Sequence, residues 1–142
     1  MVNRTQRTVA SSLVRKLLAG EITNDELESR FPRDPADPAL AGIYRRLWFF
    51  WDDRKTHKLT EAHALTEEGR QLFERCAAFL DSDLEYEWPS SIHMVPVSLI
   101  LLRLLRLRKA TEDRERKEIE RIRSFGDYEV WPFLRTRDWR RG

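Results

Sequence analysis

The most constraining feature of this sequence is the apolar pattern that follows the dipeptide Asp37-Pro38. Asp37 is a suitable N-cap, and Pro38 suits the first helical position, where a missing N–H costs nothing. Apolar residues then recur at intervals of three and four positions, which places them on one face of a helix: Leu40, Ile43, Tyr44, Leu47, Trp48 and Trp51. The pattern predicts a central core helix over residues 38–54.

Three further helices have local start or stop signals. One is expected over residues 8–19, where Gly20 can end it. Thr23 and Glu26 have the spacing of a capping box, so a short helix is expected to begin there and to end at Phe31, before Pro32. Thr66 can cap a further helix with an apolar face.

The second half of the chain contains one leucine-rich segment, residues 97–109, with only a narrow polar stripe. A helix with so little polar surface is expected to be surrounded by protein. Residues 111–118 contain no large apolar side chain and are expected to be solvated. Residues 127–142 are rich in aromatic side chains, which predicts that this end packs back onto the body of the molecule.

These elements predict a mainly helical fold. We expect a single compact domain over residues 1–142, with five or six helices and short extended segments near 83–88 and 128–132. Residues 1–7 and 136–142 are expected to be flexible. A chain of 142 residues is long enough to bury a core of its own. The expected core contains Leu13, Leu17, Leu40, Ile43, Leu47, Trp48, Trp51, Leu72, Phe73, Phe79, Leu101, Leu104 and Leu105.

The sequence contains few residues that could carry catalysis. A single cysteine, Cys76, excludes an internal disulfide and the usual cysteine-rich zinc sites, and its place on an apolar helix face indicates a small buried hydrophobe. The five glycines are dispersed, so there is no Gly-rich phosphate loop. His57, His63 and His93 lack metal-binding spacing. We expect no cofactor, assign no catalytic residue and no metal ligand, and favour a protein that is not an enzyme.

The apolar runs are too short for a membrane helix. The longest covers residues 94–102 and ends at Arg103, whereas about 20 residues are needed to cross a bilayer. No signal peptide is recognisable, and the single cysteine fits a reducing compartment. These features predict a soluble, cytoplasmic protein without a membrane partner.

Charge is segregated along the chain although the net charge is only +2. Residues 21–87 contain 16 acidic and 9 basic residues, whereas residues 88–142 contain 8 acidic and 13 basic residues. Within the acidic part, residues 81–88 alternate at period two. An extended conformation would therefore place four carboxylates on one face: Asp81, Asp83, Glu85 and Glu87. The opposite face would carry Leu84, Tyr86 and Trp88.

This acidic face has several interpretations. It can be a charged edge strand that resists aggregation, or it can pair internally with the Arg-rich helix that follows Arg103. It can also be a docking face for a basic protein, because carboxylates that repel in the free chain become favourable in the complex. A divalent cation is a further alternative, since Mg²⁺ and Ca²⁺ prefer oxygen ligands.

Two short motifs echo each other in the second half of the chain. Residues 85–89 read EYEWP and residues 127–132 read DYEVWP, which predicts a pair of short strands or two similar packing motifs. Together with LWFFWDD at residues 47–53 and VWPF at residues 130–133, these motifs resemble a family of small bacterial proteins with a domain of unknown function. The resemblance implies a mainly helical, single-domain bacterial protein and transfers no catalytic residue.

Three functional hypotheses follow. The first is a non-enzymatic protein-interaction module, of adaptor or immunity type, that binds a basic partner through Asp81, Asp83, Glu85 and Glu87. The second is a nucleic-acid-binding protein, since arginines alternate with an aromatic ring near the C-terminus and Arg4 and Arg7 add positive charge; its residues are Arg135, Arg137, Trp139 and Arg140. The third is a divalent-metal-dependent enzyme built on Asp52, Asp53, Asp81 and Asp83.

Overall fold

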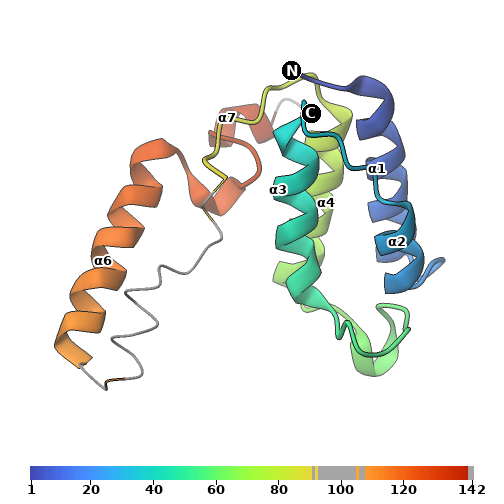
Figure 1. Cartoon of the computed structure of the whole chain (residues 1–142), viewed down its shortest axis with the longest axis horizontal. Helices are drawn as coiled ribbons and strands as arrows, with labels where there is room; N and C mark the ends of the chain where they lie inside the picture. Colours follow the sequence, from blue (N-terminus) through green and yellow to red (C-terminus); the bar gives the residue numbers. More distant parts are fainter. Residues whose placement is uncertain (91, 93–104, 106–107, 141–142) are drawn as a thin grey trace.

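The computed structural model describes residues 1–90, 92, 105 and 108–140, and it is mainly helical (Figure 1). The helices lie in the chain order α1 (Arg4–Leu18), α2 (Asn24–Arg30), α3 (Pro38–Leu47), α4 (Glu67–Asp81), α6 (Arg108–Phe125) and α7 (Thr136–Trp139). Three short 3₁₀ helices are η1 (Trp48–Phe50), η2 (Glu61–His63) and η3 (Tyr128–Val130). The predicted fold class is confirmed.

The body of the molecule is formed by α1, α3 and α4, which stand side by side, whereas α6 stands apart from them (Figure 1). The most extensive packing is between α1 and α4. Small residues face each other there, and the hydroxyl of Ser11 donates to the carbonyl of Ala77 at 3.1 Å. Ala10 and Ala77 are both buried, so the two backbones can approach closely.

Helix starts agree with the local signals. The side chain of Asp37 accepts a hydrogen bond from Ala39 N, and Pro38 occupies the first turn of α3. The capping box of Thr23 and Glu26 is present at α2, and the backbone N–H of Thr23 holds the pKa of Glu26 below its usual value. Thr66 caps α4. By contrast, α1 begins at Arg4, four residues earlier than expected, because Asn3 caps it.

The predicted helix over residues 38–54 is too long. The structure ends α3 at Leu47 and continues with the 3₁₀ turn η1, after which Trp51 is extended. The rings then point in different directions. Phe50 packs edge-on against Phe73 of α4, while the indole N–H of Trp51 donates to a carboxylate oxygen of Glu28 at 2.7 Å.

Most of the predicted core is confirmed, with two corrections. The buried members are Leu13, Leu17, Leu40, Ile43, Leu47, Trp51, Leu72, Phe73 and Phe79. Trp48 is 37% exposed, because it lies with Tyr44 on the outer face of α3, and Leu105 is 59% exposed. Leu101 and Leu104, with most of the expected helix over residues 97–109, lie outside the described residues.

The two echo motifs contact each other, but neither is a strand in the described part of the chain. Residues 83–87 are extended without sheet pairing, and residues 128–130 form η3. The indole of Trp131 donates to the hydroxyl oxygen of Tyr86 at 3.3 Å. The indole of Trp88 donates to the carbonyl of Pro132 at 3.1 Å, and its ring packs against Tyr128. The aromatic C-terminal segment therefore packs onto the body, as expected.

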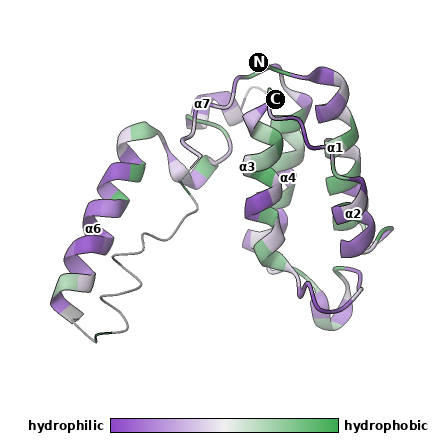
Figure 2. Ribbon diagram, in the orientation of Figure 1, coloured by the Kyte–Doolittle hydropathy of each residue, from purple (hydrophilic) through white to green (hydrophobic). Residues whose placement is uncertain are grey.

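Both ends that were expected to be flexible contain helix. Residues 4–7 form the first turn of α1, and residues 136–139 form α7. Hydrophilic residues surround most of α6 (Figure 2), as predicted for residues 111–118. Within the described ranges, no helix combines the length and the hydropathy needed to cross a membrane.

Candidate functional site

The candidate site is the acidic segment, residues 81–87, which leaves the C-terminal end of α4. Asp81 is the last residue of that helix, Ser82 has an extended backbone, and residues 83–87 form neither helix nor strand. Tyr86 and Trp88 point into the core and are less than a tenth exposed, whereas Asp83, Glu85 and Glu87 are exposed. The predicted alternation therefore holds for residues 85–88 and for the exposed position of Asp83, whereas Leu84, which was expected on the inner face, is 41% exposed. Asp81 joins the segment from the helix end.

A buried arginine fixes the start of this segment. Arg7 of α1 donates from Nη1 to the carbonyl oxygens of Leu84 at 2.8 Å and Ser82 at 3.3 Å. The same guanidinium pairs with Asp37 and lies over the ring of Phe79. Arg7 was expected to contribute to phosphate binding. That expectation is wrong, because its side chain is completely buried and its donors are used inside the protein.

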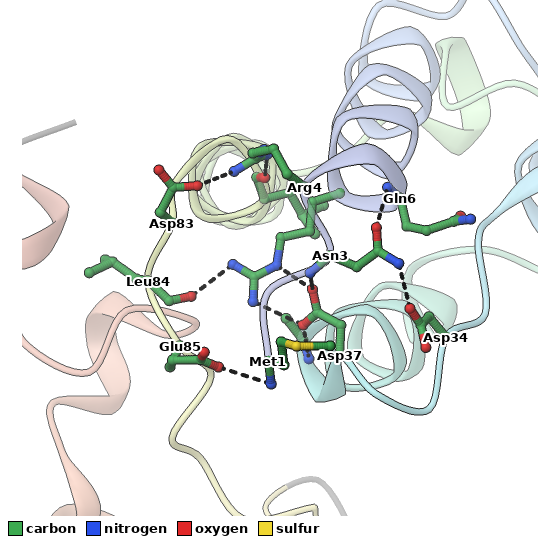
Figure 3. Close-up of polar contacts among 12 residues, drawn as sticks. Met1, Asn3, Arg4, Gln6, Asp34, Asp37, Asp83, Leu84 and Glu85 are labelled. Carbon is green, nitrogen blue, oxygen red and sulfur yellow. Dashed lines mark hydrogen bonds and ion pairs between the residues drawn. The ribbon is translucent and has the colours of Figure 1, made fainter.

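Asp37 is the centre of the polar network in Figure 3. Its carboxylate accepts hydrogen bonds from Arg7, from the backbone N–H of Asn3 and from that of Ala39. Burial alone would raise the pKa of Asp37, but the hydrogen bonds and the adjacent guanidinium of Arg7 hold it below its ordinary value. The network joins the start of α1, the start of α3 and the acidic segment.

The carboxylates of the acidic segment have partners at the N-terminal end of the chain. Arg15 pairs with Asp81. Figure 3 shows the other two pairs, in which Arg4 Nη1 lies 3.4 Å from an oxygen of Asp83 and the amino group of Met1 lies 3.3 Å from Glu85. Internal pairing was one of the expected interpretations, but these partners belong to the N-terminal end and α1. Arg103 lies outside the described residues, but most of the expected partner helix is α6, whose described ion pairs, Arg116 with Asp113 and Arg121 with Glu118, lie within that helix.

These ion pairs are on the surface. The Asp83 side chain is 88% exposed and that of Glu85 60%. Exposed pairs of this kind contribute about 0–1 kcal/mol each, because solvent screens them. Glu87 makes no ion pair with any residue that the structure describes. The carboxylates thus remain accessible to a competing cation.

The backbone of the segment is also available. Among the described residues, no backbone–backbone hydrogen bond involves residues 83–88. Side chains of the protein occupy the backbone groups of Leu84, whose carbonyl accepts from Arg7 and whose N–H donates to Ser82 Oγ at 3.4 Å. The backbone groups on either side of Leu84 can accept another extended chain alongside the segment. The side chains on its inner face hold it in position, since Tyr86 packs against Phe79 and Trp131 while Trp88 packs against Tyr128.

The predicted nucleic-acid residues lie at α7. Arg135 and Arg140 are exposed, and Arg137 Nε lies 3.7 Å from a carboxylate oxygen of Asp138. The ring of Trp139 packs against Phe133, with 5.3 Å between ring centroids. Trp139 therefore contributes to core packing and presents only part of its ring to solvent.

The four carboxylates of the proposed metal enzyme do not form one site. Asp52 and Asp53 follow η1, at the opposite end of the body from Asp81 and Asp83, because α4 runs back along α3 (Figure 1). Within the described residues, no group of three or more His, Cys, Asp or Glu side chains is arranged to hold a metal ion. The structure therefore does not bring Asp52 and Asp53 together with Asp81 and Asp83, as this hypothesis required.

Two features were not found by sequence reasoning. One is the buried pair of Arg7 and Asp37, which are thirty positions apart and carry no shared motif. The other is an open hollow between the connector that precedes α3 and the outer face of that helix, where Tyr44 and Trp48 lie. Their i, i+4 spacing places them on one helix face, but the same spacing fits a core face. Both residues were placed on the apolar face of the expected core helix, and Trp48 was also assigned to the core.

The chain was compared with known proteins at three levels. No protein-family model, no curated protein and no solved structure matches it. The resemblance to the bacterial family stays a prediction, and the function rests on the geometry described above.

Proposed function

We propose that this chain is a non-enzymatic protein-interaction module that binds a basic partner through residues 81–87. One observation carries the proposal. The segment is held extended from its inner face by Tyr86, Trp88 and Arg7, and it presents Asp83, Glu85 and Glu87 to solvent. A charged, preorganised segment loses little conformational entropy on binding.

The backbone of the segment, apart from Leu84, supports a specific binding mode. An extended partner can lie alongside residues 83–87 and exchange main-chain hydrogen bonds with them. Alternate residues of a strand lie about 6.5–7 Å apart, so a partner with Lys or Arg at every second position matches the spacing of Asp83, Glu85 and Glu87. Complementary charge would also speed the encounter.

Arg4 and Arg15 compete with such a partner. Each lies against one carboxylate of the segment in the free protein. Their weak surface pairs lower the repulsion among the acidic residues until a more extensive cationic partner replaces them. The proposal therefore predicts that removing a competing arginine strengthens binding.

The test uses an octapeptide of alternating Lys and Val, capped at both ends, with a block-sequence peptide of the same composition as control. Isothermal titration gives the Kd, and amide exchange shows whether backbone N–H groups within residues 83–87 become protected. The variant with Asp81→Asn, Asp83→Asn, Glu85→Gln and Glu87→Gln is expected to bind about tenfold or more weakly. Arg15→Gln is expected to bind about two- to fivefold more tightly.

A matched variant removes the same charge elsewhere. Asp52→Asn, Asp53→Asn, Glu21→Gln and Glu120→Gln change four exposed carboxylates outside the acidic segment. Circular dichroism and the Tm establish that each variant is folded. Equal weakening by both variants, or equal affinity for the alternating and block peptides, would show only general charge attraction and would reject the site.

A further inference from the structure

The hollow beside α3 is built by two walls. One is the connector, in which Pro32 and Pro35 lie three positions apart, and the other is the face of α3 that carries Tyr44 and Trp48. Leu40, fully buried, forms part of the lining. The volume is about 510 Å³, which is within the range of about 300–1,000 Å³ found for ligand pockets.

The walls are held by aromatic contacts. Tyr44 packs against Phe31 with 5.3 Å between ring centroids, and the guanidinium of Arg33 lies 5.6 Å from the centre of the Tyr44 ring. Burial is the main cause that raises the pKa of the Tyr44 hydroxyl, with the carboxylate of Glu28 adding to the shift. Tyr44 is thus a neutral, half-buried wall residue with a fixed ring.

The charged residues around the hollow favour an anion. Arg33 and Arg45 are both exposed lining residues. The one carboxylate in the described lining is that of Asp34, and its two oxygens already accept hydrogen bonds from the side-chain amide of Asn3 and from Ala36 N. Arg45 donates a hydrogen bond from Nη1 to the carbonyl oxygen of Ser90 at 2.8 Å. Its other N–H groups are available to a ligand.

The residue types favour a protein partner. Trp, Tyr and Arg are the residues that dominate the binding energy of protein interfaces, and they do so around pockets that take an anchor side chain. Trp48, Tyr44 and the two arginines form such a set here. Phe49, 62% exposed, lies edge-on to Trp48 and extends the apolar surface beyond the hollow.

We propose that this hollow binds an acidic segment of a partner protein, which inserts one bulky apolar side chain between Tyr44, Trp48 and the prolines while its carboxylates pair with Arg33 and Arg45. The site prefers the charge opposite to that preferred by residues 81–87. It therefore does not rest on the function proposed above, and either proposal can fail alone.

The test uses a fluorescein-labelled heptapeptide of Asp and Glu with one Phe at its centre. Fluorescence anisotropy gives the Kd, and the indole N–H signal of Trp48 in a two-dimensional NMR spectrum locates the binding. Two control peptides replace the Phe with Ser, or the acidic residues with Lys. We expect Trp48→Ala to weaken binding by about tenfold or more, and Arg33→Gln to weaken it by about threefold or more.

Matched variants at exposed residues outside the hollow are Phe125→Ala and Arg114→Gln, which are expected to leave the Kd unchanged. Equal binding of the Phe and Ser peptides, an unchanged Kd in Trp48→Ala, or no binding at about 1 mM peptide would each overturn the proposal. So would binding of oligothymidylate through Trp48 in place of the peptide, which would assign the hollow to single-stranded nucleic acid.

Discussion

Arg7 and Asp37 form a two-point ion pair in which neither side chain is exposed to solvent. Arg7 Nε lies 2.6 Å from Oδ2 of Asp37, and Nη2 lies 2.9 Å from Oδ1. The same arginine holds the carbonyl of Leu84. One interaction thus connects α1, the start of α3 and the acidic segment, so the position of that segment depends on it.

Replacing Asp37 is expected to destabilise the protein strongly. Asp37→Asn keeps a side chain that can cap α3, but it leaves the guanidinium of Arg7 buried without a counterion. The loss in the free energy of unfolding is expected to be about 3–5 kcal/mol, measured by urea unfolding. Asp53→Asn, at an exposed carboxylate, is the control and should change it by less than about 0.5 kcal/mol. A loss below about 1 kcal/mol at Asp37 would show that the pair contributes little.

The same pair predicts a pH dependence. The pKa of Asp37 is lower in the folded protein than in the unfolded chain, so its contribution to stability is present above about pH 4 and is lost as pH falls through the folded pKa. The free energy of unfolding should therefore decrease more steeply below about pH 4 in the natural chain than in Asp37→Asn. Parallel slopes in the two proteins would mean that Asp37 is not the group responsible.

A pair of glycine substitutions tests the packing of the echo motifs. In α3, a Cβ on Gly42 would lie 2.6 Å from Oη of Tyr86, whose ring is buried and whose hydroxyl accepts from Trp131. In α4, a Cβ on Gly69 would have no neighbour closer than 3.4 Å. Alanine favours a helix over glycine by about 1 kcal/mol, yet Gly42→Ala is expected to lose about 1–3 kcal/mol by overpacking.

Thermal unfolding of the two variants provides the comparison. Gly69→Ala should keep or raise the Tm, because it gains helix propensity without a clash. Gly42→Ala should lower it. If both substitutions raised the Tm, the contact between α3 and Tyr86 would have to be looser than the structure indicates.

The parts of the fold that were predicted depend on local chemistry. Asp37 and Pro38 start a helix, and Thr23 and Glu26 form a capping box, through groups within three residues of each other. The end of α3 was not predicted, because the apolar spacing continues through Trp48 and Trp51 although the two rings have different environments. Spacing alone does not distinguish a core face from an exposed apolar one.

The candidate site was predicted only in part, for a related reason. The alternation in residues 83–88 is local and correctly places the carboxylates outside and Tyr86 and Trp88 inside, but it wrongly places Leu84 inside. Which cations neutralise those carboxylates depends on tertiary contacts, and Arg4 and Arg15 are more than sixty positions away. Arg7 was misassigned because burying an arginine requires a partner that only the folded chain provides.

The last prediction concerns the thiol of Cys76, which is buried at the centre of α4 as its sequence pattern indicated. Burial raises its pKa well above the ordinary value, so hardly any thiolate exists at neutral pH. A disulfide reagent such as Ellman's reagent should therefore react only through transient opening of the fold. For a domain of ordinary stability, the rate should be about a thousandfold or more below that of a free cysteine.

The rate should approach that of a free cysteine in urea above the unfolding midpoint. Rapid modification of the protein in its native state would mean that α4 opens locally at little cost.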